Sequence, residues 1–127
     1  IEALSDGRLG YAALDVFVHP GTTETFGQTL QEAAASGLPV VAAAVGGPLD
    51  LVEHGRTGLL FDPALSGALS ACVGHLVSER AMRERMGAAA TAAVAERTWP
   101  SLTATLVEHY AHARRRMAPE RHAASRR

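Results

Sequence analysis

The sequence predicts an α/β fold: a parallel sheet of about three strands, helices on both faces and a helical segment at the C-terminal end. Three short, nearly continuous apolar runs predict the strands, because a strand buried on both faces of a parallel sheet lacks polar alternation. Helical patterns separate these runs, as expected for right-handed crossovers between parallel strands. After Pro63 the alternation ends and only helical patterns follow.

The first predicted strand covers residues 14–20, "LDVFVHP", a run rich in β-branched and aromatic residues. Helical spacing follows over residues 26–36, and Gly37 is placed to end that helix at its C′ position. Pro39 prevents the helix from continuing, so residues 40–44 form the second predicted strand.

A pair of glycines then turns the chain before Pro48, which suits the first position of a short helix ending at Gly55. Residues 58–61, "GLLF", form the third predicted strand. Because three strands are few for a parallel sheet, we expect the chain to be a piece of something larger, with an apolar sheet edge exposed beside residues 16–18.

The rest of the chain is predicted to be helical, with Trp99 and Pro100 marking the break before the last helix. The predicted helices cover residues 65–78, 79–96 and 101–117. Residues 118–127 are predicted to be a basic, disordered tail.

Composition excludes several classes of protein. Hydrophobic residues make up 47% of the 127 residues and charged residues 20%, which favours a compact domain over a disordered chain. The formal net charge of −1 argues against a nucleic-acid partner. Cys72 is the single cysteine and no apolar run reaches the ~20 residues of a membrane span, so we expect a cytoplasmic protein.

The cations are all arginine, and residues 101–127 carry six of the 12 against two acidic residues. The segment "ARRRMAPERHAASRR", residues 113–127, could contact anionic lipid headgroups, where each cation gains about 1 kcal/mol, as a peripheral contact at the inner face of the membrane. The alternative is a solvated tail. The six histidines are scattered and form no metal-ligand spacing with Cys72 or the acids, so we expect no metal site.

The junction between the first strand and the following helix is the candidate site, because ligands of open α/β sheets bind at the carboxyl ends of strands. Backbone N–H groups of Gly27, Gln28 and Thr29 would point out of the helix start, where they suit a phosphate. Gly27 has no Cβ and would let a ligand approach the backbone closely. His19, at the end of the strand, either packs in the interior or lines the pocket, and Gly46 and Gly47 either line it or form a plain turn.

Two glutamates flank these donors. Glu24 precedes the helix start, and Glu32 lies eight residues later, which corresponds to roughly 12 Å of helix. That separation is too large for two carboxylates that share a proton, so glycoside hydrolysis is disfavoured. It suits carboxylates that hold two ends of an extended ligand rich in hydroxyls. The alternative is that the helix dipole alone favours Glu24 and that Glu32 faces water.

The segment "ETFGQTLQE" resembles the E-x7-E element of family 4 glycosyltransferases, retaining nucleotide-sugar enzymes of the GT-B fold. The resemblance continues through "ASGLPVVA", the glycine pair and "GRTGLL", and "RTWPSLTATLVEHY" resembles the family's C-terminal Trp-helix-Tyr segment. It covers about residues 7–111. It implies that residues 1–117 are the C-terminal portion of a GT-B donor-binding domain, with a partial Rossmann-like sheet.

The resemblance also implies roles for single residues. Glu24, the implied catalytic residue, would bind hydroxyls of the donor sugar and position it without acting as a nucleophile. Glu32 would hold the ribose hydroxyls. Backbone amides would bind the rest of the donor: those of Phe26 and Gly27 the sugar, those of Gln28 and Thr29 the diphosphate.

The implied reaction is transfer of a hexose, with mannose from GDP-mannose the donor that the motif most resembles, to an unidentified acceptor. The nucleotide sugar is the substrate, and no cofactor is implied. The family's Arg and Lys ligands of the diphosphate and its N-terminal Rossmann-like domain, which carries the acceptor site, are not found in this sequence, so we expect the fragment to be inactive alone. The alternatives are a noncatalytic nucleotide- or sugar-binding module and a GT-B nucleotide-sugar epimerase.

Overall fold

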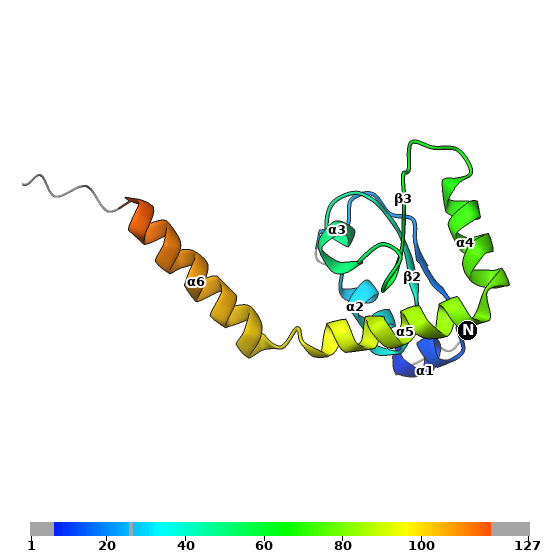
Figure 1. Ribbon diagram of the computed structural model, residues 1–127, viewed down its shortest axis with the longest axis horizontal. Coiled ribbons are helices and arrows are strands. Elements are labelled where there is room, and N and C mark those ends of the chain that lie inside the picture. The colour runs from blue at the N-terminus through cyan, green and yellow to red at the C-terminus, as the bar shows by residue number, and fades with distance from the viewer. Residues whose placement is uncertain (1–6, 26, 118–127) are drawn as a thin grey trace, which may run out of the picture. The chain divides into compact units, whose positions relative to one another are not determined.

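The computed structural model describes residues 7–25 and 27–117 (Figure 1). Contacts divide the chain into two units, residues 1–96 and residues 97–127, which are described separately. The elements in chain order are α1 (Gly7–Ala12), β1 (Phe17–His19), α2 (Gln28–Ala35), β2 (Val40–Ala43), α3 (Pro48–Leu51), β3 (Gly58–Phe61), α4 (Ala68–Ser78), α5 (Arg80–Ala95) and α6 (Trp99–Met117).

The strands form one parallel sheet in the order β1-β2-β3. Phe17 is paired with Val40, and Val40 with Gly58, so the three strands begin at the same level and their carboxyl ends lie at the same edge. Among the described residues β1 pairs with β2 alone, and Val18 is 36% exposed. This is the apolar sheet edge expected beside residues 16–18.

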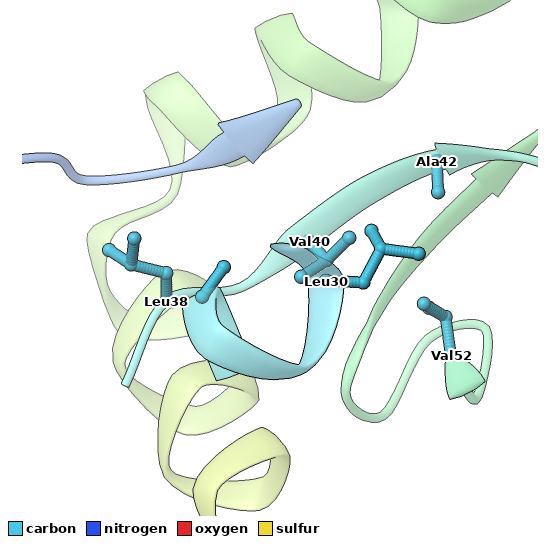
Figure 2. Packing of buried hydrophobic residues seen from close by; sticks show 6 residues of the cluster. Leu30, Leu38, Val40, Ala42 and Val52 are labelled. Carbon is cyan, nitrogen blue, oxygen red and sulfur yellow. The ribbon is translucent and has the colours of Figure 1, made fainter. Parts of the chain in front are cut away.

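Both faces of the sheet are apolar, because successive side chains of a strand point to opposite faces. Val40 and Ala42 lie on the face covered by α2 and α3, together with Leu30 and Val52 (Figure 2). On the other face, a second buried cluster joins residues of β2 and β3 to α4 and α5: Val41, Ala43, Leu59, Phe61, Leu76 and Met86. The predicted α/β class with helices on both faces is confirmed.

The predicted elements are confirmed, with shifted boundaries. The short helix predicted to end at Gly55 is α3, which ends at Leu51, because Val52 has an extended backbone with φ −113° and ψ 117°. β3 coincides with the predicted strand, whereas β1 and β2 lie inside theirs. α2 begins at Gln28 and not at residue 26, because Gly27 precedes it with a left-handed φ of 60°. α4 begins at Ala68, since turns occupy the residues before it and Gly67 has a φ of 83°.

α5 contacts the sheet and also packs against the C-terminal part of α2. The approach is close because Gly87 has no side chain: a Cβ there would overlap the carbonyl oxygen of Gly37. The Thr91 hydroxyl donates a 3.0 Å hydrogen bond to the carbonyl of Ala34. These contacts hold α2, and with it the loop before it, against the rest of the first unit.

The second unit contains α6, which begins at Trp99, so the prediction of a helix break at Trp99 and Pro100 is wrong. Proline is tolerated in the first turn of a helix, where its missing N–H has no helical partner. The break lies one residue earlier, where the backbone N–H groups of Thr98 and Ser101 each bond the other's hydroxyl oxygen, at 3.1 and 3.3 Å, as in a capping box. Across the described residues, each helix is too short or too polar to traverse a bilayer. The predicted tail, residues 118–127, lies outside the described residues.

Candidate functional site

The candidate site lies where β1 ends and α2 begins, at the edge of the sheet formed by the carboxyl ends of the strands. The loop after β2 lies next to it, because the Gly47 N–H donates a 3.0 Å hydrogen bond to the carbonyl of Glu24. The first two strand-to-helix loops are therefore joined through their backbones.

Gly46 and Gly47 are required by this contact, and a plain turn does not account for them. A Cβ on Gly47 would lie 2.8 Å from the Thr25 carbonyl oxygen, and one on Gly46 would lie 2.9 Å from that of Glu24. Gly46 also has a left-handed φ of 62°. The two glycines thus allow the loop that carries Glu24 to lie directly on the loop after β2.

Gly27 packs against two leucines. A Cβ on it would overlap the side chain of Leu51 in α3 and would lie 3.2 Å from Leu30 Cδ1. Its role toward a ligand stays a prediction. Gly27 also supplies the positive φ with which the chain enters α2.

Glu24 contacts the beginning of α2. Its Oε1 accepts a 2.8 Å hydrogen bond from the Gly27 N–H, and its side chain is 26% exposed. A carboxylate is favoured at this position because it accepts a helix-start donor and complements the helix dipole. The Gly27 amide, one of the predicted donors for a ligand, is thus engaged by Glu24 in this structure.

His19 reaches Glu24 from the end of β1. Its Nε2 lies 3.8 Å from Glu24 Oε2, which is beyond hydrogen-bond distance. That nitrogen is buried and has no hydrogen-bond partner among the described residues. Oε1 of Glu24 is therefore bonded to the Gly27 N–H, whereas Oε2 has the Nε2 of His19 nearby without a hydrogen bond between the two.

Gln28 and Thr29 form the first turn of α2 and are exposed. Their amides precede the helical bond from the Gln31 N–H to the Gly27 carbonyl, so α2 itself offers them no partner. The binding of an anion by these two amides stays a prediction. Phe26, the remaining predicted donor, lies outside the described residues.

Glu32 is exposed and is held by two side chains. Its Oε2 accepts a 3.1 Å hydrogen bond from the Tyr11 hydroxyl, and its Oε1 accepts one of 3.2 Å from Gln28 Nε2. The pKa of Tyr11 is raised by partial burial and then by the hydrogen bond and negative charge of Glu32. Glu32 is therefore oriented by the protein before any ligand arrives.

Tyr11 is a residue of this site that sequence reasoning missed. It lies in α1, 21 positions before Glu32, and its ring packs edge-on against Phe17 at 5.6 Å. No short motif connects the two residues in the sequence. Only the packing of α1 beside β1 and α2 brings the hydroxyl to the carboxylate.

No group of three or more His, Cys, Asp or Glu side chains within residues 7–25 and 27–117 is arranged to hold a metal ion. A cavity of about 280 Å³ lies elsewhere, lined by residues that include Asp15, Pro39 and Arg80. Pro39 comes directly before β2, so this cavity is at the amino ends of the strands.

Comparisons with known proteins identify relatives of this chain. Residues 6–93 match the model of the family "Glycosyl transferases group 1". A GDP-mannose-dependent alpha-mannosyltransferase of Mycolicibacterium smegmatis is 54% identical over 101 residues, which cover 79% of this chain and 26% of the relative. This chain thus spans about a quarter of the length of that curated relative.

Two solved structures are also similar. The Anabaena HepE protein in complex with UDP-glucose superposes with a TM-score of 0.68 at 31% identity, over 80% of this chain and 29% of that protein. The C-terminal domain of the group 1 glycosyl transferase LpcC from Francisella tularensis superposes with a TM-score of 0.68 at 25% identity, over 76% of this chain and 50% of that domain.

Proposed function

The chain belongs to the group 1 glycosyl transferases, and on that premise we propose that it is the donor-binding portion of a retaining hexosyltransferase that uses a nucleotide sugar. The observation that carries the proposal is the position of Glu24. Its carboxylate lies in the loop that follows β1 and accepts a hydrogen bond from the Gly27 N–H, next to Gln28 and Thr29, whose amides have no partner within α2. The carboxylate proposed to bind the sugar and the amides proposed to bind the diphosphate are thus adjacent.

At the sugar end, Glu24 binds hydroxyls of the donor and orients the ring. A carboxylate offers about four lone-pair sites, and sugar hydroxyls are donors that such sites accept. The backbone amides of Phe26 and Gly27 complete this end of the donor site. For Gly27 this requires that its amide be shared between Glu24 and the sugar.

At the centre of the donor, the amides of Gln28 and Thr29 bind the diphosphate. Negative charge grows on the diphosphate as the bond to the sugar breaks, and fixed N–H dipoles at a helix start stabilise it. The acceptor hydroxyl oxygen then bonds the anomeric carbon on the face that the diphosphate leaves, which retains the configuration, and the hydroxyl proton passes to the departing diphosphate oxygen. Glu24 positions the sugar throughout and forms no covalent bond.

At the nucleotide end, Glu32 accepts hydrogen bonds from the ribose hydroxyls. Tyr11 and Gln28 each donate one hydrogen bond to it, which leaves lone pairs on both oxygens for a diol. GDP-mannose is the proposed donor, since the Mycolicibacterium smegmatis relative is a GDP-mannose-dependent enzyme. The HepE complex with UDP-glucose supports the broader assignment of a nucleotide-sugar site.

The organisation of the whole protein is also a proposal. Residues 1–117 are proposed to be the C-terminal portion of a GT-B donor domain, and the basic residues 118–127 to make a peripheral contact with the inner face of the membrane in a cytoplasmic protein. An N-terminal Rossmann-like domain supplies the acceptor site, so the fragment alone turns over no donor. The share of its relatives that the chain spans supports this division.

Donor-dependent release of free nucleoside diphosphate from the full-length protein tests the proposal. A panel of nucleotide sugars is screened, and GDP-mannose is expected to release GDP fastest. Glu24→Gln is expected to lower the rate at least tenfold, the effect of losing about 1.4 kcal/mol of transition-state stabilisation. Glu84→Gln, in which the substituted residue pairs with Arg80 on α5 outside the site, is the matched control. Absence of release with every donor would overturn the proposal.

A further inference from the structure

His19 has a feature that the proposed roles leave unexplained. It is the last residue of β1, its side chain is 19% exposed, and its Nε2 is buried without a hydrogen-bond partner among the described residues. A buried polar atom that lacks a partner is unfavourable, because it has lost its hydrogen bonds to water and gained none in the protein. Such atoms are few in native proteins, and each calls for an explanation.

The surroundings of His19 indicate what this nitrogen is placed for. The nearest acceptor identified is Glu24 Oε2, at 3.8 Å. A Cβ on Gly21 would lie 3.1 Å from Nε2, so a larger residue there would crowd the imidazole. The backbone of Gly21 does not have a positive φ, so its conformation does not require glycine. The missing side chain matters because it leaves room for the imidazole beside Glu24.

We propose that His19 is a positioning residue that holds Glu24 when the donor binds. The inference rests on the proposed function and extends it to a residue outside the E-x7-E element. In the donor-bound protein the 3.8 Å gap closes to a hydrogen bond, so that Nε2–H holds Oε2 while the Gly27 N–H holds Oε1. Held at both oxygens, the carboxylate keeps one rotamer and meets the sugar hydroxyls already oriented.

His19 acts through Glu24 because its own nitrogen is shielded from solvent. A ligand cannot reach an atom with no exposed surface, whereas Glu24 is 26% exposed and faces both the loop and solvent. The donor function needs a proton on Nε2. Both the neutral Nε2–H tautomer and the imidazolium carry that proton.

A double-mutant cycle in the full-length protein tests the link. His19→Leu removes the N–H, and His19→Gln retains a side-chain N–H donor. Each is made alone and together with Glu24→Gln, and KM and kcat are measured for GDP-mannose. His19→Leu is expected to lower kcat/KM by about tenfold, the size expected of a hydrogen bond to a charged group, and His19→Gln by less than about threefold. In the Glu24→Gln background His19→Leu should add less than about twofold. His75→Leu, on an exposed position of α4, is the control.

Three results would overturn the inference: wild-type kinetics in His19→Leu, an equal loss in His19→Gln and His19→Leu, or an undiminished effect of His19→Leu in the Glu24→Gln background. The second would indicate that His19 serves packing alone. If the wild-type protein releases no diphosphate from any donor, the proposed function fails separately. The same cycle measured as the affinity for GDP-mannose by calorimetry then decides the link, since additive binding free energies would show that His19 and Glu24 do not interact in the donor-bound protein.

Discussion

The Tyr11 hydroxyl donates a 3.1 Å hydrogen bond to Oε2 of Glu32, which joins α1 to the second turn of α2. The Tyr11 ring packs against Phe17 of β1 with an interplanar angle of 65°. One side chain thus contacts the sheet with its ring and the proposed ribose-binding acid with its hydroxyl. Glu32 is therefore positioned by a residue that lies outside the E-x7-E element.

This contact predicts an alkaline shift in the ionisation of Tyr11. Its pKa lies above the ordinary value of 10.0, because partial burial and the negative charge of Glu32 both disfavour the phenolate. The stability that the contact contributes is therefore complete below the pKa of the unfolded chain and is lost as the pH rises through the folded value. A pH titration of tyrosinate absorbance, taken as the difference between wild type and Tyr11→Phe, isolates Tyr11. The midpoint of that titration should lie above pH 10.0, and Glu32→Gln should lower it. A midpoint at or below 10.0 in the wild type would contradict the assignment.

Glu32→Gln is expected to weaken donor binding to the full-length protein by about 1.5–3 kcal/mol, the range for a hydrogen bond to a charged group. The amide keeps the size of the side chain but loses the charge that both Tyr11 and a ribose diol would contact. Titration calorimetry with GDP-mannose measures the change, with Glu84→Gln as the control. Equal affinities of wild type and Glu32→Gln would remove Glu32 from the ribose site.

Gly47→Ala is expected to weaken donor binding without touching the donor. The added methyl group would lie 2.8 Å from the Thr25 carbonyl oxygen and 3.1 Å from that of Glu24, so the loop carrying Glu24 must move. Gly74→Ala in α4 is the matched control, because its Cβ would meet nothing within 4 Å. Calorimetry should show weaker binding for the first variant alone. Wild-type affinity in Gly47→Ala would show that the loop tolerates the shift.

Gly87→Ala is expected to destabilise the protein by about 1–3 kcal/mol, the usual cost of forcing extra atoms into a packed interface. Its Cβ would overlap the Gly37 carbonyl oxygen and lie 3.7 Å from Pro39 Cδ, so α5 would be pushed away from the C-terminal end of α2. Gly74→Ala, again the control, should gain about 0.5–1 kcal/mol, because alanine replaces glycine inside a helix. Chemical denaturation gives both values. Equal stabilities of the two variants would mean that α5 and α2 do not pack as described.

Local sequence was sufficient to predict the sheet and where the candidate site residues lie in the fold. The apolar run at Val40–Ala43 is continuous because both faces of β2 are covered, and that continuity is visible without a structure. Gly37, with a φ of 81°, follows the last turn of α2 as predicted. Glu24, Gln28 and Thr29 lie at the strand-to-helix junction for the same reason, since strand and helix boundaries depend mainly on neighbouring residues. The start of α6 was misplaced because proline is compatible with both a break and a first helical turn.

The sequence by itself thus determined the order of strands and helices, the buried faces and the junction that carries the two glutamates. Only the tertiary structure decided which side chains hold those glutamates: His19 beside Glu24, and Tyr11 on Glu32. It also decided that Gly27 faces Leu51 and that Gly47 supports the loop at Thr25. The physical reason is the separation along the chain over which each kind of interaction acts. Hydrophobic periodicity and turn chemistry act over a few residues, whereas these contacts join segments that meet only after the helices have packed on the sheet.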